Sequence, residues 1–300
     1  MPAPLLMVLA TLLFATMGVC VKLASELYAA SEIVMYRGLV GMVLMALMTR
    51  RHQMSLRTTV PGMHLWRSIS GVAALSLWFY AIGKLPLATA MTLNYMSSVW
   101  MALFMLGGAV LLGAQRLDWR LVAAVLLGFV GVALILRPTL DQQQLWHGLA
   151  GLLSGMLAAL AYLQVTALGR AGEPELRVVF YFSLGGAIAG AATTAVAVGT
   201  LQPHTLKGMA LLLAVGLLAT TAQVAMTRAY AVGRPLVNAC LQYLGIVFSF
   251  GYGMLLFQDP LTLSATVGML LIVAAGLAAT LLRARVAPPA KDSQFNPAEV

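Results

Sequence analysis

About ten apolar runs follow one another along this chain, each near the roughly 20 residues that a helix needs to cross a bilayer. They are continuously apolar and lack the period-two alternation of a barrel strand, so helices are expected. The runs lie near Leu5–Val21, Ile33–Met48, Trp66–Ile82, Thr89–Leu112, Trp119–Leu136, Gly148–Leu168, Val178–Val198, Met209–Ala229, Leu236–Phe257 and Leu263–Leu282. We therefore predict an all-α integral membrane protein with about ten transmembrane helices.

Composition supports lipid as the solvent for most of the chain. Hydrophobic residues make up 61% of the 300 residues and charged residues 9%, whereas a soluble domain carries about 25% charged residues. The first run has the length of a signal-peptide core. However, no Lys or Arg precedes it, so we interpret it as a retained helix.

Two stretches about 150 residues apart read almost alike, which indicates an internal repeat. Tyr80–Lys84 is Tyr-Ala-Ile-Gly-Lys, and Tyr230–Arg234 is Tyr-Ala-Val-Gly-Arg. Each precedes a helix with polar positions and then a second apolar helix. The pattern predicts two five-helix repeats, residues 1–138 and 145–285, followed by a disordered cytoplasmic tail, residues 286–300.

An odd number of spans in each repeat means that the two copies enter the membrane from opposite sides. Inverted repeats place corresponding helices around a shared site near the membrane midplane, and rocking one set against the other opens that site to each side in turn. The expected fold class is therefore two inverted five-helix repeats around a central cavity.

Basic residues indicate the orientation of the chain. With the N-terminus in the cytoplasm and alternating loops, about thirteen Lys and Arg residues, including Arg50, Arg51 and Arg67, fall on the cytoplasmic side, against about four on the other. This bias predicts a multi-pass protein of the bacterial inner membrane with both termini in the cytoplasm. It also accounts for the net charge of +9. The expected partner is therefore the lipid bilayer, and no binding to nucleic acid is expected.

The chain resembles the EamA-type branch of the drug/metabolite transporter superfamily over nearly its whole length. The resemblance rests on the paired layout, on Gly131–Pro138 (Gly-Val-Ala-Leu-Ile-Leu-Arg-Pro), and on Arg37, which matches an arginine common in the second helix of that branch. An acidic residue usual in the turn between helices four and five is replaced in Gly113–Arg116, whereas Asp259 keeps it in the second half. The resemblance implies a small-metabolite transporter.

Motifs for chemistry are missing from the sequence. It contains no Gly-x-x-x-x-Gly-Lys-Ser/Thr phosphate loop, its four histidines are scattered, and no Ser/His/Asp set emerges. We therefore expect no catalytic residue, no metal site and no cofactor. A membrane-embedded lipid-modifying enzyme stays a remote alternative, because such chemistry normally needs acidic or histidine clusters.

Charged residues near the membrane are few, and two are candidates for function. Glu32, beside the first external loop, could titrate and couple transport to protons; the alternative is a solvated helix start. Arg37 could snorkel to the interface, pair structurally with Glu32, or point into the bundle and bind a substrate carboxylate. Proton coupling and facilitated diffusion both stay open.

Polar residues in the fourth and ninth spans are the main candidates for a cavity lining. Asn94 and Ser98 share one helical face with Tyr95 beside them, and the ninth span carries the corresponding polar set. The alternative is interhelical hydrogen bonding, at about 0.6 kcal/mol per contact. The predicted substrate-binding residues are Arg37, Asn94, Tyr95, Ser98, Gln223, Asn238, Gln242 and Tyr243.

The function expected from these features is secondary transport by alternating access. The leading substrates are small organic metabolites, namely amino acids or related carboxylate-bearing compounds, moved outward across the inner membrane. Import of a vitamin or nucleoside-like metabolite is the alternative. The protein is expected to act as a monomer or homodimer.

Overall fold

The computed structural model describes residues 2–97, 99–101, 103–104, 107, 119–136, 142–232, 241–259 and 262–286. These residues form helices joined by turns and loops, without a strand among them, which confirms the all-α class for this part of the chain. The helices are α1 (Ala3–Ala24), α2 (Ala30–Arg51), α3 (Pro61–Lys84), α4 (Leu87–Tyr95), α6 (Trp119–Leu136), α7 (Gln142–Arg170), α8 (Glu175–Ala197), α9 (Leu206–Val232), α11 (Leu244–Phe257) and α12 (Leu263–Val286).

Within the described residues, six helices are long and apolar enough to cross a membrane. They are α1, α2, α3, α8, the Leu145–Arg170 part of α7 and the Leu206–Ala229 part of α9. Shorter apolar segments occur in α11 and α12. The protein is therefore a multi-pass helical membrane protein. The predicted tail is residues 286–300; Val286 is the last residue of α12, and residues 287–300 lie outside the described residues.

A turn interrupts the fourth and ninth predicted spans at matching places. Met96 follows the last residue of α4, and Tyr243 precedes the first residue of α11. Hydrogen bonds of the tighter i→i+3 kind occur at both points: Met96 N shares its donor between Thr92 O (3.2 Å) and Leu93 O (3.3 Å), and Ile246 N donates to Tyr243 O (3.0 Å). The sequence predicted one uninterrupted helix for each of these spans, and the two turns correct that prediction. Neither turn contains a proline, so the sequence carried no sign of them.

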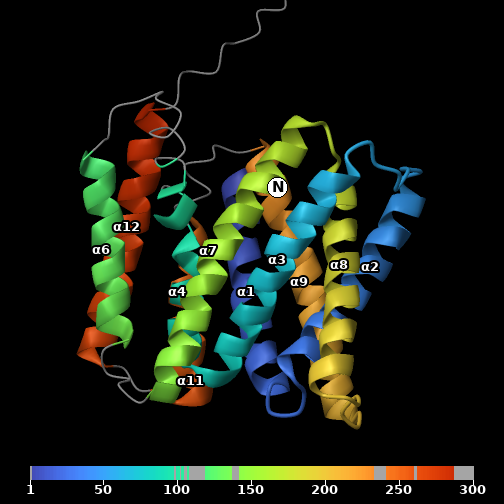
Figure 1. Ribbon diagram of the computed structural model, residues 1–300, viewed down its shortest axis with the longest axis horizontal. Helices are drawn as coiled ribbons and strands as arrows, with labels where there is room; N and C mark the ends of the chain where they lie inside the picture. Colours follow the sequence, from blue (N-terminus) through green and yellow to red (C-terminus); the bar gives the residue numbers. More distant parts are fainter. Residues whose placement is uncertain are drawn as a thin grey trace, which may run out of the picture.

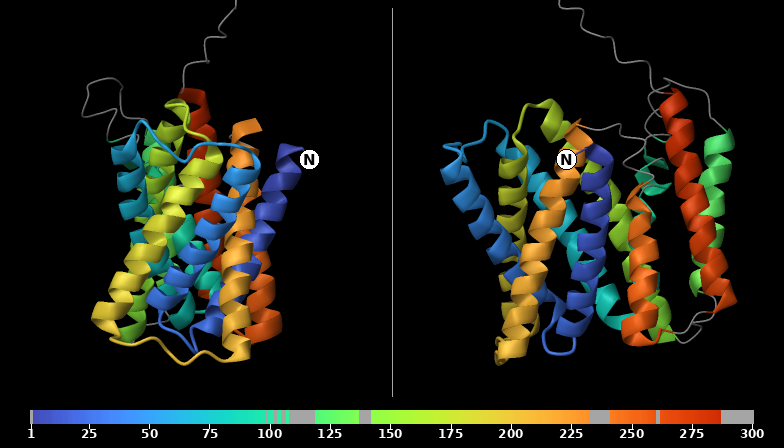
Figure 2. Two further views of the ribbon diagram at one scale, coloured as in Figure 1. Left: turned by 90° about the vertical axis from the view of Figure 1, so that its right-hand side faces the viewer. Right: turned by 180° about the vertical axis from the view of Figure 1, so that it is seen from behind.

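Helices from the two halves of the chain are interleaved. α2 packs on α8, α1 on α9, α3 on α7 and α6 on α12, while α4 contacts both α7 and α11. Figures 1 and 2 show α6 and α12 side by side at one edge of the bundle, and α2 and α8 at the opposite edge. The interior is therefore built jointly by residues 3–136 and 142–286.

Small residues allow the backbones of α2 and α8 to approach closely. A Cβ atom at Gly38 would lie 2.7 Å from the carbonyl oxygen of Ser183, and one at Gly190 would lie 2.7 Å from the Cα atom of Met35. Close packing of this kind drives helix association in lipid, where apolar side chains gain nothing by leaving the solvent. This contact fixes Arg37, which neighbours Gly38, relative to α8.

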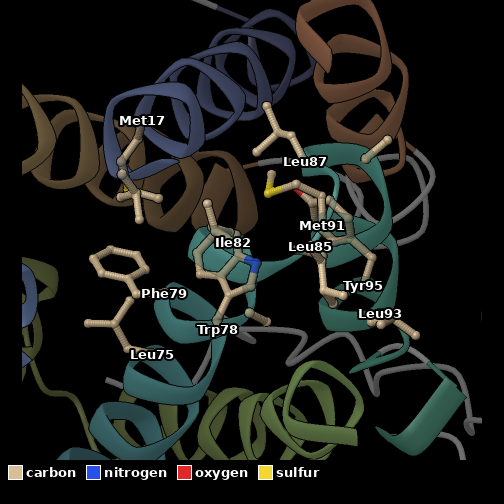
Figure 3. Close-up of a cluster of buried hydrophobic side chains, with 14 of the residues drawn as sticks. Met17, Leu75, Trp78, Phe79, Ile82, Leu85, Leu87, Met91, Leu93 and Tyr95 are labelled. Carbon is tan, nitrogen blue, oxygen red and sulfur yellow. The ribbon is translucent and has the colours of Figure 1, made fainter. Parts of the chain in front are cut away.

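Large apolar side chains fill one end of the bundle. We call the end where α1 begins the N-terminal end, and the end where α1 stops the opposite end. Met17, Phe79, Ile82, Leu87 and Met91 are fully buried and come from α1, α3 and α4 (Figure 3). They lie toward the opposite end, where α3 stops and α4 begins.

Candidate functional site

A cavity lies beside this apolar cluster, in the interior of the bundle. Its walls come from α1, α2, α3, α4, α7, α8 and α9 and from the residues just before α11. Leu75, Trp78 and Tyr95, which Figure 3 draws within the apolar cluster, also line the cavity. Both halves of the chain therefore contribute to one central space.

Five of the predicted substrate-binding residues line this cavity: Arg37, Asn94, Tyr95, Gln223 and Gln242. Tyr243 is buried and its ring centroid lies 6.4 Å from that of Tyr95, but it does not reach the cavity wall. Ser98 and Asn238 lie outside the described residues.

Arg37 points into the bundle and not to the membrane interface. Its side chain comes from the second turn of α2, and the residue is only 5% exposed. Nη2 donates a hydrogen bond to Oε1 of Gln223 (3.0 Å), and Cζ lies 5.1 Å from the ring centroid of Phe182. Nε has no hydrogen-bond partner within the described part of the chain. Arg37 makes no ion pair with Glu32 in the structure.

Arg67 is a second buried cation in the same cavity, and the sequence analysis missed it. The prediction counted Arg67 with the cytoplasmic loop charges, but it lies inside α3 and is 5% exposed. Its Cζ lies 4.2 Å from the ring centroid of Phe182. A Cβ atom at Gly71 would overlap Nη1 of Arg67, so glycine makes room for the guanidinium. Gly71 one turn after an in-helix arginine was the available signal.

Asn94 is positioned by the contact between α4 and α7. Its Nδ2 donates to Oγ of Ser154 (3.0 Å), which in turn donates to the carbonyl oxygen of Gly151 (2.6 Å). A Cβ atom at Gly155 would lie 2.7 Å from the carbonyl oxygen of Leu93. The glycines of α7 therefore let the end of α4 approach, and the Asn94 side chain is held at the cavity wall.

Gln242 occupies the corresponding place in the second half. It precedes the turn at Tyr243 and shares a side-chain hydrogen bond with Tyr162 of α7, another lining residue. Asn94 and Gln242 thus both stand next to a turn that interrupts a span. Interrupted membrane helices are where many transporters form their substrate sites.

Charge in the cavity is unbalanced. Among the described lining residues, Arg37 and Arg67 are cationic and none is a carboxylate. Charged groups within a membrane are costly, and where they line an interior cavity they usually serve a substrate or ion pathway. The lining as a whole combines two guanidinium groups, several amides and aromatic rings, which suits a small anionic organic molecule.

Glu32 lies away from the cavity and is fully buried, so the prediction of a solvated helix start is wrong. It is the third residue of α2, and Oε2 accepts a hydrogen bond from the backbone N–H of Ala29 (3.2 Å). Oε1 accepts one from the backbone N–H of Gln202 (2.8 Å). Glu32 therefore caps α2 and ties it to the loop before α9.

Comparison with known proteins identifies the chain as a membrane transporter. Residues 1–137 match the EamA-like transporter family. The chain is 34% identical over 279 residues to the pseudopaline exporter CntI of Pseudomonas aeruginosa, an alignment that covers 90% of this chain and 93% of that protein. The protein belongs to the EamA-like transporter family, as its resemblance to the drug/metabolite transporters implied.

Other similar proteins differ in how much of the chain they match. An uncharacterized transporter of Helicobacter pylori is 26% identical over 279 residues, covering 91% of this chain and 92% of that protein. A riboflavin transporter of Rhizobium johnstonii is 30% identical over 181 residues, covering 59% and 56%. A crystal structure with a TM-score of 0.64 and 18% identity covers 93% of this chain and 98% of that one, which supports the fold alone.

Proposed function

We propose that this protein is a secondary transporter that exports small carboxylate-bearing metabolites, such as amino acids or related compounds, across the bacterial inner membrane. The observation that carries the proposal is Arg37, a guanidinium that is buried in the central cavity. Among the described residues it faces no carboxylate there, and its Nε has no partner. A guanidinium binds a carboxylate through two parallel hydrogen bonds, which gives both affinity and orientation.

The other site residues have complementary roles in this proposal. Asn94, Gln223 and Gln242 bind polar groups of the substrate, and Tyr95 bounds its apolar part, with Tyr243 packed behind the Tyr95 ring. Ser98 and Asn238, which lie outside the described residues, keep their predicted substrate-binding role in this proposal. Gln223 also holds the Arg37 guanidinium through its hydrogen bond, so it positions the group that binds the carboxylate.

Alternating access in this proposal depends on ten spans arranged as two inverted five-helix repeats, residues 1–138 and 145–285. The observed helix contacts support this relation between the repeats. The repeats match α1 with α7, α2 with α8, α3 with α9, α4 with α11 and α6 with α12. When each helix is replaced by its match, every major contact becomes a contact that is also observed. For example, α1 on α9 becomes α7 on α3, and α2 on α9 becomes α8 on α3. The α2–α8, α4–α11 and α6–α12 pairs map onto themselves.

Outward transport is supported by the exporter from Pseudomonas aeruginosa, which aligns with 90% of this chain. Orientation with both termini in the cytoplasm follows from the basic residues, apart from Arg67, that gather at the N-terminal end. Import of a vitamin or nucleoside-like metabolite is the second candidate, and the partial match to a riboflavin transporter supports a vitamin-like substrate. Facilitated diffusion is the favoured mode, since no carboxylate lines the described cavity; Glu32 is the candidate if protons are coupled.

The test is untargeted metabolite profiling of the medium from bacteria that overproduce the protein, with Arg37→Ala as the matched variant at equal membrane levels. We expect a carboxylate-bearing compound to accumulate outside only with the unaltered protein. An unchanged medium, or loss of a compound from it, contradicts export. Equal accumulation with Arg37→Ala contradicts the role of Arg37.

A further inference from the structure

Arg67 has hydrogen-bond donors that nothing in the described protein uses. Both Nε and Nη1 are buried without a partner, and the residue is 5% exposed. A buried charge is strongly destabilising unless it is paired and its donors are satisfied. An unpaired guanidinium that lines a cavity therefore points to an anionic group that the cavity is built to receive.

The position of this guanidinium is fixed by its neighbours. Phe182 presents its ring to Cζ at 4.2 Å, a cation–π contact that supports the group without using its N–H donors. Gly71, on the next turn of α3, leaves the space that Nη1 occupies. Arg67 is thus held in one place while its donors stay available.

Arg37 and Arg67 are close enough to act on one small molecule. Their Cζ atoms lie 5.1 and 4.2 Å from the same Phe182 ring centroid, so they are separated by no more than the sum of these distances. Three carboxylates of the described protein are engaged elsewhere: Glu32 with backbone amides, Glu173 with Arg177, and Asp259 with Lys22. The two guanidinium groups therefore keep their charge for a ligand.

We propose that Arg67 forms a second anion subsite and that the transported metabolite carries two carboxylates, one for Arg37 and one for Arg67. This inference rests on the proposed function, in which Arg37 binds a carboxylate, and it narrows the substrate class to dicarboxylates. An amino acid with a carboxylate side chain has the required chemistry. The corresponding amino acid with an amide side chain lacks the second negative charge.

The experiment compares matched ligand pairs by isothermal titration calorimetry on the purified protein in detergent. The pairs are L-glutamate with L-glutamine and succinate with succinamate, because each differs by a single carboxylate. A charged hydrogen bond changes affinity by about 10- to 100-fold, so we expect the dicarboxylate of each pair to bind at least about tenfold more tightly.

Variants assign this preference to one residue. In Arg67→Gln we expect L-glutamate to bind about as weakly as L-glutamine does, with L-glutamine unchanged. In Arg37→Gln we expect both to bind more weakly, because the shared carboxylate loses its partner. Arg50→Gln, an exposed arginine of α2, is the control and should leave both affinities unchanged.

The outcomes separate this inference from the function on which it rests. Equal binding of both members of each pair to the unaltered protein, or a preference that persists in Arg67→Gln, overturns the second subsite and leaves carboxylate transport standing. Failure of all four ligands to bind the unaltered protein contradicts the carboxylate site itself, and the second subsite with it.

Discussion

The two ends of the α2–α8 pair are fastened by different kinds of interaction. At the N-terminal end, Glu173 lies against Arg177 (3.1 Å) and His64 (3.0 Å), and Oγ1 of Thr58 donates to it at 2.9 Å. At the opposite end, Glu32 accepts hydrogen bonds from backbone N–H groups alone. Both clusters tie the start of one helix of the pair to the loop after the other, but only the first contains an ion pair.

The stability of the N-terminal end therefore depends on the ionisation of Glu173, whereas that of the opposite end depends on the conformation of the loop that contains Gln202. Under the proposed inversion, the two clusters occupy equivalent places, because Glu173 precedes α8 and joins the loop before α3, while Glu32 begins α2 and joins the loop before α9. A carrier that opens at alternate ends needs two closures of moderate strength. Conditions that weaken only one of them would bias the protein toward one state.

Removing the carboxylate at the N-terminal end should have the largest effect on stability. Glu173→Ala removes the carboxylate that His64 and Arg177 share, and leaves Arg177 only its hydrogen bonds to the carbonyl oxygen of Ser55. Breaking a buried pair from one side costs about 3 kcal/mol or more. We expect a clear fall in the midpoint of thermal unfolding in detergent. Arg50→Gln serves as the control. An unchanged midpoint would mean that this end is not held by charge.

Acid should weaken the N-terminal end selectively. Burial raises the pKa of Glu173, but hydrogen bonds from Thr58, His64 and Arg177, together with the Arg177 charge, lower it below its ordinary value of 4.5. Stabilisation is therefore fully present above pH 4.5 and is lost as the pH falls through the lower folded pKa. Unfolding midpoints followed from neutral to acidic pH should drop more steeply in the unaltered protein than in Glu173→Gln; parallel curves would contradict this.

Glu32→Ala should destabilise the opposite end by a smaller amount. The change removes the capping interaction of α2 and the tie to Gln202, each worth about 1 kcal/mol, without stranding a buried cation. The same thermal assay measures it beside Glu173→Ala. A loss as large as that of Glu173→Ala would remove the distinction between the two ends.

Tyr36→Phe should have the smallest effect. It removes the hydroxyl that lies 2.7 Å from Nε2 of His204 in an exposed position, and such a bond contributes about 0.5 kcal/mol. We expect a midpoint close to that of the unaltered protein. A large drop would mean that the Tyr36–His204 contact, and not Glu32, fastens the opposite end.

The sequence predicted the helical class and much of the cavity because both depend on patterns that repeat. Apolar runs mark the helices, and the repeat drew attention to Asn94, Tyr95 and Gln242, three residues beside interrupted spans. Arg37 was found because a charge inside an apolar run is conspicuous.

What the sequence did not predict depends on packing at a distance. Arg67 lies near the start of its helix, where a charge is ordinarily assigned to a loop, and only the ring of Phe182 and the space beside Gly71 reveal its burial. Glu32 has the pattern of a solvated helix start, but the loop at Gln202 covers it. The Arg67–Phe182 and Glu32–Gln202 contacts each join the two halves of the chain, and a local sequence pattern does not encode such contacts.

Locking one end of the α2–α8 pair tests alternating access most directly. Ser31 and Thr194 at the opposite end lie with their side-chain oxygens 2.9 Å apart, and cysteines at these two positions, in a protein otherwise lacking cysteine, could be joined by oxidation. We expect the oxidised protein to lose export of the compound found by metabolite profiling and to regain it on reduction. Export that continues with the disulfide formed would contradict alternating access through this end.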